Sequence, residues 1–314
     1  MKNSLVQKPI IPIFFSTDNN YAPFLGVAIQ SIVENASRDF DYRIYVLTTD
    51  LSFSNRMRIR ASAKGLANVK FVNVSRELSR VKDKLHIRDY YTSATYYRFF
   101  IAGMFPQYKK ALYLDCDIVV SGDISELYST ELGDRLVGAI PEEVMLNVGV
   151  FGKYVDTVLE MPCSEYFNAG VLVMNLDEFR RCNIENRFIK LLSERRFDVT
   201  QDQDYLNVLC YKNSVLIDFE WNKTPFADEM FVEGKTPKLV HYKINWKPWH
   251  YDGVVYGDLF WKYAERNNYY RIIKKILRKY TPEERLRDSL AYKNLYKLAE
   301  YETKVVIEGI PKNA

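Results

Sequence analysis

Two spacings of apolar residues alternate along the first quarter of the chain. Short apolar runs at 11–17, 42–49 and 69–74 have the length and composition of buried strands. Between the first two runs, Leu25, Ala28, Ile29 and Ile32 recur at helical spacing and predict a helix over 22–34. A second helix is predicted over 52–65, with a capping serine at its start and a glycine at its end. Strands that alternate with helices in this way predict βαβ units and a mostly parallel sheet.

The alternation continues less regularly through about residue 250. A basic, aromatic stretch over 86–105 is expected to be helical from Thr92, and the run over 111–118 is expected to be a strand that ends at a turn. The other predicted elements are a strand over 136–142, a strand and the start of a helix over 165–181, a helix over 201–210, and strand-like runs over 215–222 and 238–249. We therefore expect one α/β domain over residues 1–258.

Residues 259–314 are expected to form a C-terminal helical appendage. Lysine, arginine and tyrosine become frequent after Phe260, and a break between helices is predicted at Thr281-Pro282. These helices either cap the domain or place a basic, aromatic face on an anionic membrane. One sequence does not fix which face is exposed, so both interpretations stay open here.

Composition narrows the class of protein. The chain has 314 residues, and a hydrophobic content of 47% with 27% charged residues is ordinary for a globular protein. Its four cysteines lie far apart and form neither a zinc pattern nor a disulfide framework, which favours a reducing compartment. A net charge of +4 is too small to indicate nucleic-acid binding. Because no stretch approaches the roughly 20 apolar residues of a membrane span and no signal peptide is evident, we expect a cytoplasmic protein.

Two carboxylates interrupt the apolar run ALYLDCDIVV at residues 111–120. Asp115 and Asp117 would lie on the same side of this strand if it stays extended. Two adjacent carboxylates repel each other, and a divalent cation removes that repulsion. Oxygen ligands suit Mg²⁺ or Mn²⁺, which commonly keep coordination positions for phosphates of a substrate. Ligands of open α/β sheets bind at the carboxyl ends of strands, where these acids are expected.

An ordered set of motifs resembles the family 8 glycosyltransferases, the retaining nucleotide-sugar group with bacterial galactosyl- and glucosyltransferases. The motifs are FFSTDNNY (14–21), TYYRFF (95–100), LYLDCDIVVSGDISELY (112–128), YFNAGVLVMNL (166–176), QDQDYLN (201–207) and HYKINWKPW (241–249). The resemblance spans about residues 11–250. It implies a Rossmann-like GT-A fold with a mixed, mostly parallel central sheet, and transfer of glucose or galactose from a UDP-sugar to a glycan or a glycosylated protein.

The resemblance also implies roles for individual residues. Asp115, Asp117 and His241 correspond to the ligands of Mn²⁺ (or Mg²⁺), and Lys247 corresponds to a lysine that contacts the diphosphate. Asp18 and Asn20 lie where the family holds the uridine, and Thr17 and Cys116 accompany them in binding the donor. The positions around the donor sugar are Arg98, Asn168, Ala169, Asp202 and Gln203, of which Gln203, Asp202, Asn168 and Arg98 are the expected catalytic residues.

Retention of anomeric configuration requires either a covalent intermediate or displacement on one face of the sugar. The amide of Gln203 is a poor nucleophile, which favours departure of UDP and attack on the same face, with a UDP phosphate oxygen accepting the proton of the acceptor. The chain departs from the family pattern at Ile244, where a glycine is expected, and Glu142 is a candidate contact for a sugar hydroxyl. We expect residues 143–164 to form an acceptor loop that could close as a lid.

Each of these residues also has an ordinary structural interpretation. Asp18 could cap a helix, His241 could be a structural histidine, and Asn168 could close a turn. Arg98 could pair with Asp89 or Glu142. Asp202 and Asp204 could be first-turn acids of a helix.

Other protein classes remain as alternatives. A haloacid-dehalogenase-like phosphatase also places two aspartates at the end of an apolar strand, although usually on its first strand. A non-catalytic nucleotide-sugar-binding module is the second alternative. A nucleic-acid binder would rest only on the basic tail, which acidic residues interrupt. A peripheral contact of the tail with the inner face of the cell membrane would bring an enzyme close to cell-surface glycan acceptors.

Overall fold

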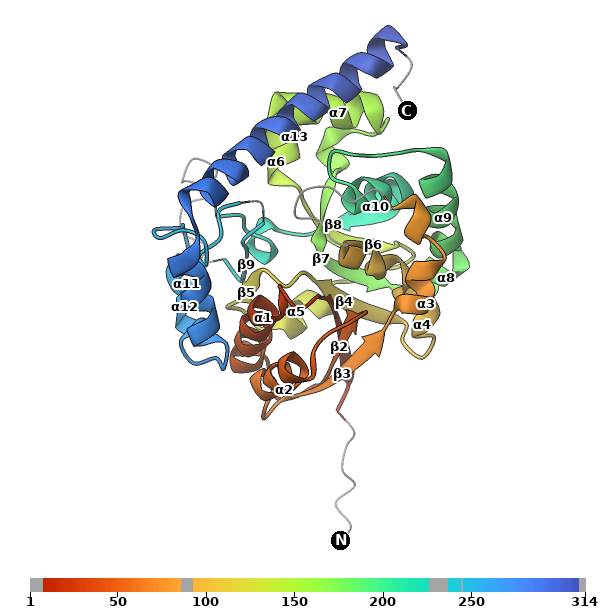
Figure 1. Cartoon of the computed structure of the whole chain (residues 1–314). Coiled ribbons are helices and arrows are strands. Elements are labelled where there is room, and N and C mark those ends of the chain that lie inside the picture. The colour runs from red at the N-terminus through yellow and green to blue at the C-terminus, as the bar shows by residue number, and fades with distance from the viewer. Residues whose placement is uncertain (1–7, 86–92, 226–236, 244, 311–314) are drawn as a thin grey trace.

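The computed structural model describes residues 8–85, 93–225, 237–243 and 245–310. Its centre is a seven-stranded sheet in the order β3-β2-β1-β4-β7-β6-β8, with helices on both faces (Figure 1). The strand pairs are parallel except those that β7 makes with β4 and β6. A second, two-stranded sheet joins β5 and β9. The predicted α/β class with a mixed, mostly parallel sheet is therefore confirmed.

The first quarter of the chain folds as its apolar spacing predicts. The elements are β1 (Ile10–Ser16), α1 (Ala22–Asn35), β2 (Asp41–Thr48), α2 (Phe53–Ser62) and β3 (Ala67–Asn73). Ser52 caps α2, since its hydroxyl accepts a hydrogen bond from the Asn55 N–H at 3.2 Å. Gly65 follows the helix with φ +97°, a conformation that favours glycine. β1 and β2 are largely buried on both faces because each layer of helices covers one face of the sheet, whereas β3 lies at the edge and is mostly half-buried or exposed.

The expected strand over 111–118 is two strands. β4 (Lys110–Leu114) ends before the aspartates, and β5 (Ile118–Val120) belongs to the smaller sheet with β9 (Leu239–His241). The Asp115 N–H still donates to the Gly170 carbonyl at 2.8 Å, and the Tyr242 N–H donates to the Asp117 carbonyl at 2.8 Å. Between these two bonds the backbone leaves β7 of the large sheet and pairs instead with the segment that contains β9. The aspartates therefore lie at the carboxyl end of β4, as expected, but not on one continuous strand.

Other predicted elements are shorter than expected. A 3₁₀ helix over Ser93–Phe100 leads into α4 (Ile101–Met104), whereas residues 86–92, including Asp89, lie outside the described residues. The strand-like run over 215–222 contains β8 (Ser214–Leu216) and a 3₁₀ turn, and β9 is the one strand among the described residues of the run over 238–249. Ile244 is also outside the described residues. Further helices and strands between β3 and residue 210 are α3 (Ser75–Ser79), α5 (Ile124–Ser129), β6 (Val137–Pro141), β7 (Phe167–Asn175), α8 (Leu176–Arg181), α9 (Ile184–Glu194) and α10 (Asp202–Cys210).

The segment 143–164, which was expected to be an acceptor loop, is mostly helical, so the expectation of a loop was wrong, and its contact with an acceptor stays a prediction. It contains α6 (Glu143–Asn147) and α7 (Gly149–Val158). The ring of Phe151 on α7 packs edge-on against Tyr292 and Tyr296 of the C-terminal helix, with ring centres 6.4 and 6.1 Å apart. This packing holds α7 against the C-terminal helix.

The C-terminal segment forms three helices, α11 (Gly257–Ala264), α12 (Tyr270–Lys279) and α13 (Pro282–Glu308), with the predicted break between the last two. α11 and α12 pack against α1, where the Asn267 side-chain amide donates to the Gly26 carbonyl at 2.9 Å. α13 runs along α7 at the top of Figure 1. This packing agrees with the cap interpretation and lends no support to membrane contact.

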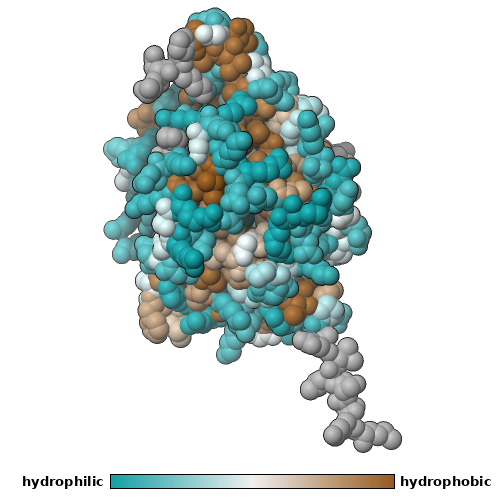
Figure 2. Space-filling view, turned by 90° about the vertical axis from the view of Figure 1, so that its right-hand side faces the viewer, coloured by the Kyte–Doolittle hydropathy of each residue, from teal (hydrophilic) through white to brown (hydrophobic). Residues whose placement is uncertain are grey.

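Apolar side chains are mostly enclosed by these layers. Figure 2 looks onto the side of the molecule that lies at the right in Figure 1; that face is largely hydrophilic, with apolar atoms gathered at its upper tip. All four cysteines are free thiols. Within the described part of the chain, no helix combines the length and apolar character needed to cross a membrane.

Candidate active site

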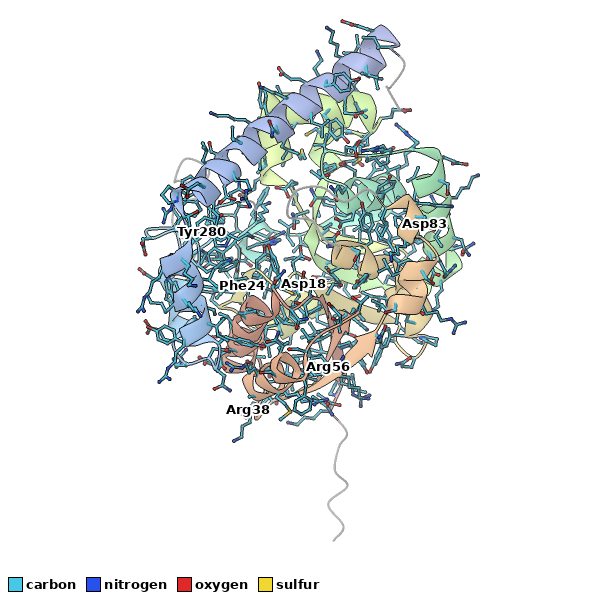
Figure 3. All side chains as sticks on the ribbon, viewed as in Figure 1. Asp18, Phe24, Arg38, Arg56, Asp83 and Tyr280 are labelled. Carbon is cyan, nitrogen blue, oxygen red and sulfur yellow. The ribbon has the colours of Figure 1, made fainter. Side chains whose placement is uncertain are left out.

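One cavity lies where the carboxyl ends of β1 and β4 meet β7, β9 and the start of α10. Apart from Asn20, it is lined by all the residues that the sequence analysis assigns to the site, namely Thr17, Asp18, Arg98, Asp115, Cys116, Asp117, Asn168, Ala169, Asp202, Gln203, His241 and Lys247. The Asn20 side chain is exposed, and its backbone N–H donates to the Asp18 carboxylate at 2.9 Å. Asp18 also accepts from the Tyr21 N–H at 2.9 Å, so it holds the turn before α1. Asp18 lies near the middle of the molecule in Figure 3.

Three potential metal ligands converge at the floor of this cavity. One ligand atom each from Asp115, Asp117 and His241 lies within 4.8 Å of the others. The Nε2 atom of His241 is 3.2 Å from an Asp117 oxygen and 3.8 Å from an Asp115 oxygen. Two carboxylates and an imidazole could together hold a divalent cation.

A chain of amides fixes which nitrogen of His241 faces the aspartates. The Gly170 N–H donates to the Asn168 side-chain oxygen at 2.9 Å, which identifies that atom as an acceptor. The same oxygen accepts from the Asn222 amide nitrogen at 2.8 Å, so the Asn222 oxygen faces His241 Nδ1 at 2.9 Å. Nδ1 therefore carries the proton in the neutral imidazole. The Nε2 lone pair then points at two carboxylates, an arrangement that a cation between them stabilises.

Gly170 on β7 leaves room for these ligands. A Cβ atom at this position would lie 2.4 Å from His241 Cε1 and 2.5 Å from an Asp115 oxygen. No side chain fits there while both ligands stay in place. Sequence analysis did not assign a role to Gly170, although a glycine within the apolar strand pattern FNAGVLV is a signal of close approach.

Lys247 reaches the metal ligands from the loop after β9. Its ammonium group donates to an Asp117 oxygen and to the Tyr242 carbonyl, both at 2.6 Å. Burial by itself raises the pKa of the Asp117 carboxyl, but Lys247 and His241 outweigh it and hold that pKa well below its usual range. The carboxylate is thus ionised at neutral pH, the form that binds metal.

Arg98 links the metal ligands to the start of α10. It is 2% exposed, and its guanidinium lies 3.2 Å from an Asp115 oxygen and 3.3 Å from an Asp202 oxygen. It also donates to the Ala169 carbonyl and lies over the Tyr113 ring at 4.3 Å. Burial raises the pKa of Asp202 to about 6, although Arg98 opposes this effect.

Gln203 is held in one orientation. Its side-chain oxygen accepts from the Asn168 amide at 3.0 Å and from the Ala169 N–H at 2.9 Å, and its nitrogen donates to the Tyr166 hydroxyl at 3.2 Å. Tyr166 in turn donates to Asp204 at 2.8 Å. Asp204 is fully buried and accepts four hydrogen bonds, and burial raises its pKa. Asp204 therefore holds the Tyr166 hydroxyl that binds Gln203, and it is not among the residues that line the cavity.

A buried ion pair forms another part of the cavity wall. Glu142 accepts from the Asn168 amide at 2.6 Å and pairs with Lys243, a cavity residue that sequence analysis missed. Burial raises the pKa of Glu142, but Lys243 outweighs this effect and the pKa is lowered. Arg98 pairs with Asp115 and Asp202 in the described structure, whereas Glu142 takes Lys243 as its partner. The Glu142 carboxylate therefore lines the cavity while it is bound to Asn168 and Lys243.

Sequence comparison relates this chain to known glycosyltransferases. The model of the family Glycosyl transferase family 8 matches residues 12–253. The lipopolysaccharide 1,3-galactosyltransferase of Salmonella typhimurium is 28% identical over 270 residues, covering 82% of this chain and 78% of that protein. General stress protein A of Bacillus subtilis is 26% identical over 263 residues, covering 76% of this chain and 87% of that protein.

Solved structures share the fold. The galactosyltransferase LgtC in complex with donor and acceptor sugar analogs has a TM-score of 0.67 and 27% identity, covering 82% of this chain and 96% of LgtC. The apo structure of the bifunctional glycosyltransferase WbbM has a TM-score of 0.76 and 27% identity, covering 86% of this chain. This chain spans 52% of that WbbM chain and 23% of the streptococcal relatives Gly and GlyA.

Proposed function

Because this chain belongs to glycosyl transferase family 8, we propose that it transfers glucose or galactose from a UDP-sugar to a glycan or a glycosylated protein. The observation that carries this proposal is the convergence of Asp115, Asp117 and His241 beside the ammonium group of Lys247. A galactosyltransferase among its relatives supports a hexose donor. We propose a retaining, metal-dependent reaction that takes place in the cytoplasm.

The proposed donor lies across the cavity with its diphosphate at the metal ligands. When bound there, a divalent cation, Mn²⁺ or Mg²⁺, supplies positive charge that stabilises the UDP leaving group. Lys247 adds a second positive charge at the same place, where negative charge develops as the glycosidic bond breaks. Thr17, Asp18 and Cys116 line the cavity beside the turn that leads into α1, which suits the nucleoside end of the donor.

Arg98, Asn168, Ala169, Asp202 and Gln203 are proposed to surround the donor sugar. Asp202 and Asn168 carry oxygen and nitrogen atoms that can bind sugar hydroxyls. The Gln203 oxygen is held by two donors, so its position relative to the sugar is fixed before the donor binds. A group that is already oriented stabilises a developing positive charge at low cost in reorganisation.

Retention is proposed to proceed by attack on the face from which UDP departs. The two carboxylates nearest to Gln203 in sequence are engaged: Asp202 pairs with Arg98, and Asp204 accepts four hydrogen bonds. A phosphate oxygen of the departing UDP then accepts the acceptor's proton. Trapping a glycosyl adduct on Gln203, Asp202 or Asp204 that turns over to product would overturn this part of the proposal.

Family membership sets aside the phosphatase alternative, and a non-catalytic binding module remains the competing function. Release of UDP from a panel of UDP-, GDP- and ADP-sugars, with Mn²⁺ or with a chelator, distinguishes the two. We expect manganese-dependent release from one UDP-hexose that is lost in Asp117→Asn and kept in Asp134→Asn, whose carboxylate is exposed. If the protein binds a UDP-sugar but releases no UDP from it with any glycan acceptor, the result would favour the binding module.

The domain division remains part of this proposal. We propose a GT-A catalytic domain over residues 1–258 and a helical appendage over 259–314. The packing of α13 along α7 supports a cap over contact with the membrane, and nucleic acid is not a proposed partner. Truncation after residue 258 tests the division, because an independent domain would keep a cooperative unfolding transition.

A further inference from the structure

We infer that Asp288 on α13 is a positioning residue for the loop that carries Lys247, so the C-terminal helix is part of the donor site. The inference deepens the proposed function and rests on it, because it assigns Lys247 to the diphosphate. Asp288 lies outside residues 12–253, which the family model matches. Residues 242–251, apart from residue 244, are called the lysine loop below.

Asp288 binds the lysine loop on both sides of Lys247. Its backbone carbonyl accepts from the Asn245 side-chain amide. Its carboxylate accepts from the Tyr251 hydroxyl at 2.8 Å, and the same oxygen accepts from the Tyr280 hydroxyl at 2.6 Å. One residue of α13 thus contacts the loop at two points. Hydrogen bonds to a charged group are among the stronger ones in proteins.

These contacts lead directly to the lysine. The Lys247 carbonyl accepts from the N–H groups of His250 and Tyr251 at 2.9 and 3.0 Å, which closes a turn. The Lys247 ammonium group donates hydrogen bonds to the Tyr242 carbonyl and to the Asp117 carboxylate. Movement of Tyr251 would therefore move the turn that aims Lys247 at the metal ligands.

Aromatic stacking holds the loop from two directions. Trp249 stacks on Phe24 of α1, with ring centres 3.8 Å apart and planes within 15°. His250 stacks on Tyr280, with ring centres 3.9 Å apart and planes within 6°. Phe24 and Tyr280 are labelled in Figure 3, the first close to Asp18 and the second at the α12–α13 junction. The loop therefore lies between α1 and the α12–α13 junction.

The start of α13 is itself fixed next to this contact. Thr281 and Glu284 form a capping box, in which the Glu284 carboxylate accepts from the Thr281 N–H at 2.7 Å. Arg285, on the same turn, lies over the Tyr251 ring at 4.9 Å. This geometry gives Asp288 a defined position from which to hold the loop, and the helix serves a purpose beyond covering apolar surface.

The test compares three changes on α13. Asp288→Ala removes the carboxylate, Asp288→Asn keeps an oxygen acceptor, and Thr303→Ala removes a buried hydroxyl that donates to the Ala299 carbonyl of the same helix. Two readouts are measured for each: UDP affinity by calorimetry with Mn²⁺, and amide hydrogen exchange across 242–251. A hydrogen bond to a charged group typically changes an equilibrium roughly tenfold to a hundredfold, so we expect about tenfold weaker UDP affinity and faster loop exchange in Asp288→Ala.

We expect Asp288→Asn to recover most of both losses and Thr303→Ala to show neither. Unchanged exchange and unchanged UDP affinity in Asp288→Ala would overturn the inference, as would an equal loss in Thr303→Ala. If Asp288→Ala does not fold, the double change Tyr251→Phe and Tyr280→Phe removes the two hydroxyl donors and keeps both rings. A wild-type protein that binds no UDP would count against the proposed function, and the exchange comparison would still decide the role of Asp288.

Discussion

Gly170→Ala adds one methyl group next to the metal ligands. The new Cβ atom would lie 2.4 Å from His241 Cε1 and 2.5 Å from an Asp115 oxygen, whereas ordinary contacts begin at 3.4 Å. Gly170 has no left-handed backbone angle, so alanine fits the strand itself. The effect of the substitution therefore comes from steric overlap of the new methyl group with His241 and Asp115.

Neither neighbour can move away freely. His241 is held through Nδ1 by Asn222, and the Asp115 N–H is bonded to the Gly170 carbonyl at 2.8 Å. Overpacking of this kind typically costs about 1–3 kcal/mol of folding stability. Disturbing the orientation of metal ligands typically costs roughly 10–100-fold in metal affinity. We expect Gly170→Ala to bind Mn²⁺ at least about tenfold more weakly, which corresponds to about 1.4 kcal/mol.

Electron paramagnetic resonance of free Mn²⁺ measures the affinity, and denaturant unfolding measures the stability. Gly138→Ala on β6 is the matched control, because its Cβ would also meet side chains, at 3.0 Å, but none belongs to the metal site. It should lose stability and keep its Mn²⁺ affinity. Gly149→Ala has no atom within 4 Å of the new Cβ and should change neither. Wild-type Mn²⁺ affinity in Gly170→Ala would refute the assignment of these ligands.

Four further changes have defined outcomes. Asn222→Leu removes the acceptor that orients His241, so Mn²⁺ affinity by the same resonance assay should fall roughly 10–100-fold. Tyr166→Phe takes away the acceptor of the Gln203 amide proton and should lower kcat for UDP release more than it raises the donor KM. The pKa of Asp202 is raised to about 6, so the metal-free protein should lose on the order of 3 kcal/mol of unfolding free energy as pH rises from about 4 to 7, and Asp202→Asn should remove that slope in denaturant titrations. Thr281→Ala breaks the capping box of α13 and should lower the unfolding free energy by about 1 kcal/mol.

Local patterns in the sequence were enough to predict much of the fold and the site. The first three strands and two helices follow from apolar spacing, because each element is defined by neighbours in the chain. The two aspartates stand out for the same reason, since carboxylates at the end of an apolar run are costly unless something binds them. The break before α13 was predictable from Thr281-Pro282, which starts a helix.

Features that depend on partners distant in sequence could not be predicted in this way. β4 ends at Leu114 because Ile118 pairs with His241, and nothing near Ile118 in the sequence indicates that pairing. The orientation of His241 depends on Asn222, which no motif singled out. Within residues 143–164, α7 packs against α13, a contact between segments distant in sequence that no local pattern indicates. Tertiary contacts decide such segments.

The central claim is that this chain binds a uridine diphosphate through a cation held by Asp115, Asp117 and His241. Calorimetric titration of UDP into the protein, first with Mn²⁺ and then with a chelator, tests it most directly. We predict binding that requires the metal and that disappears in Asp117→Asn. Equal affinity for UDP with metal and with chelator, in a folded protein, would contradict it.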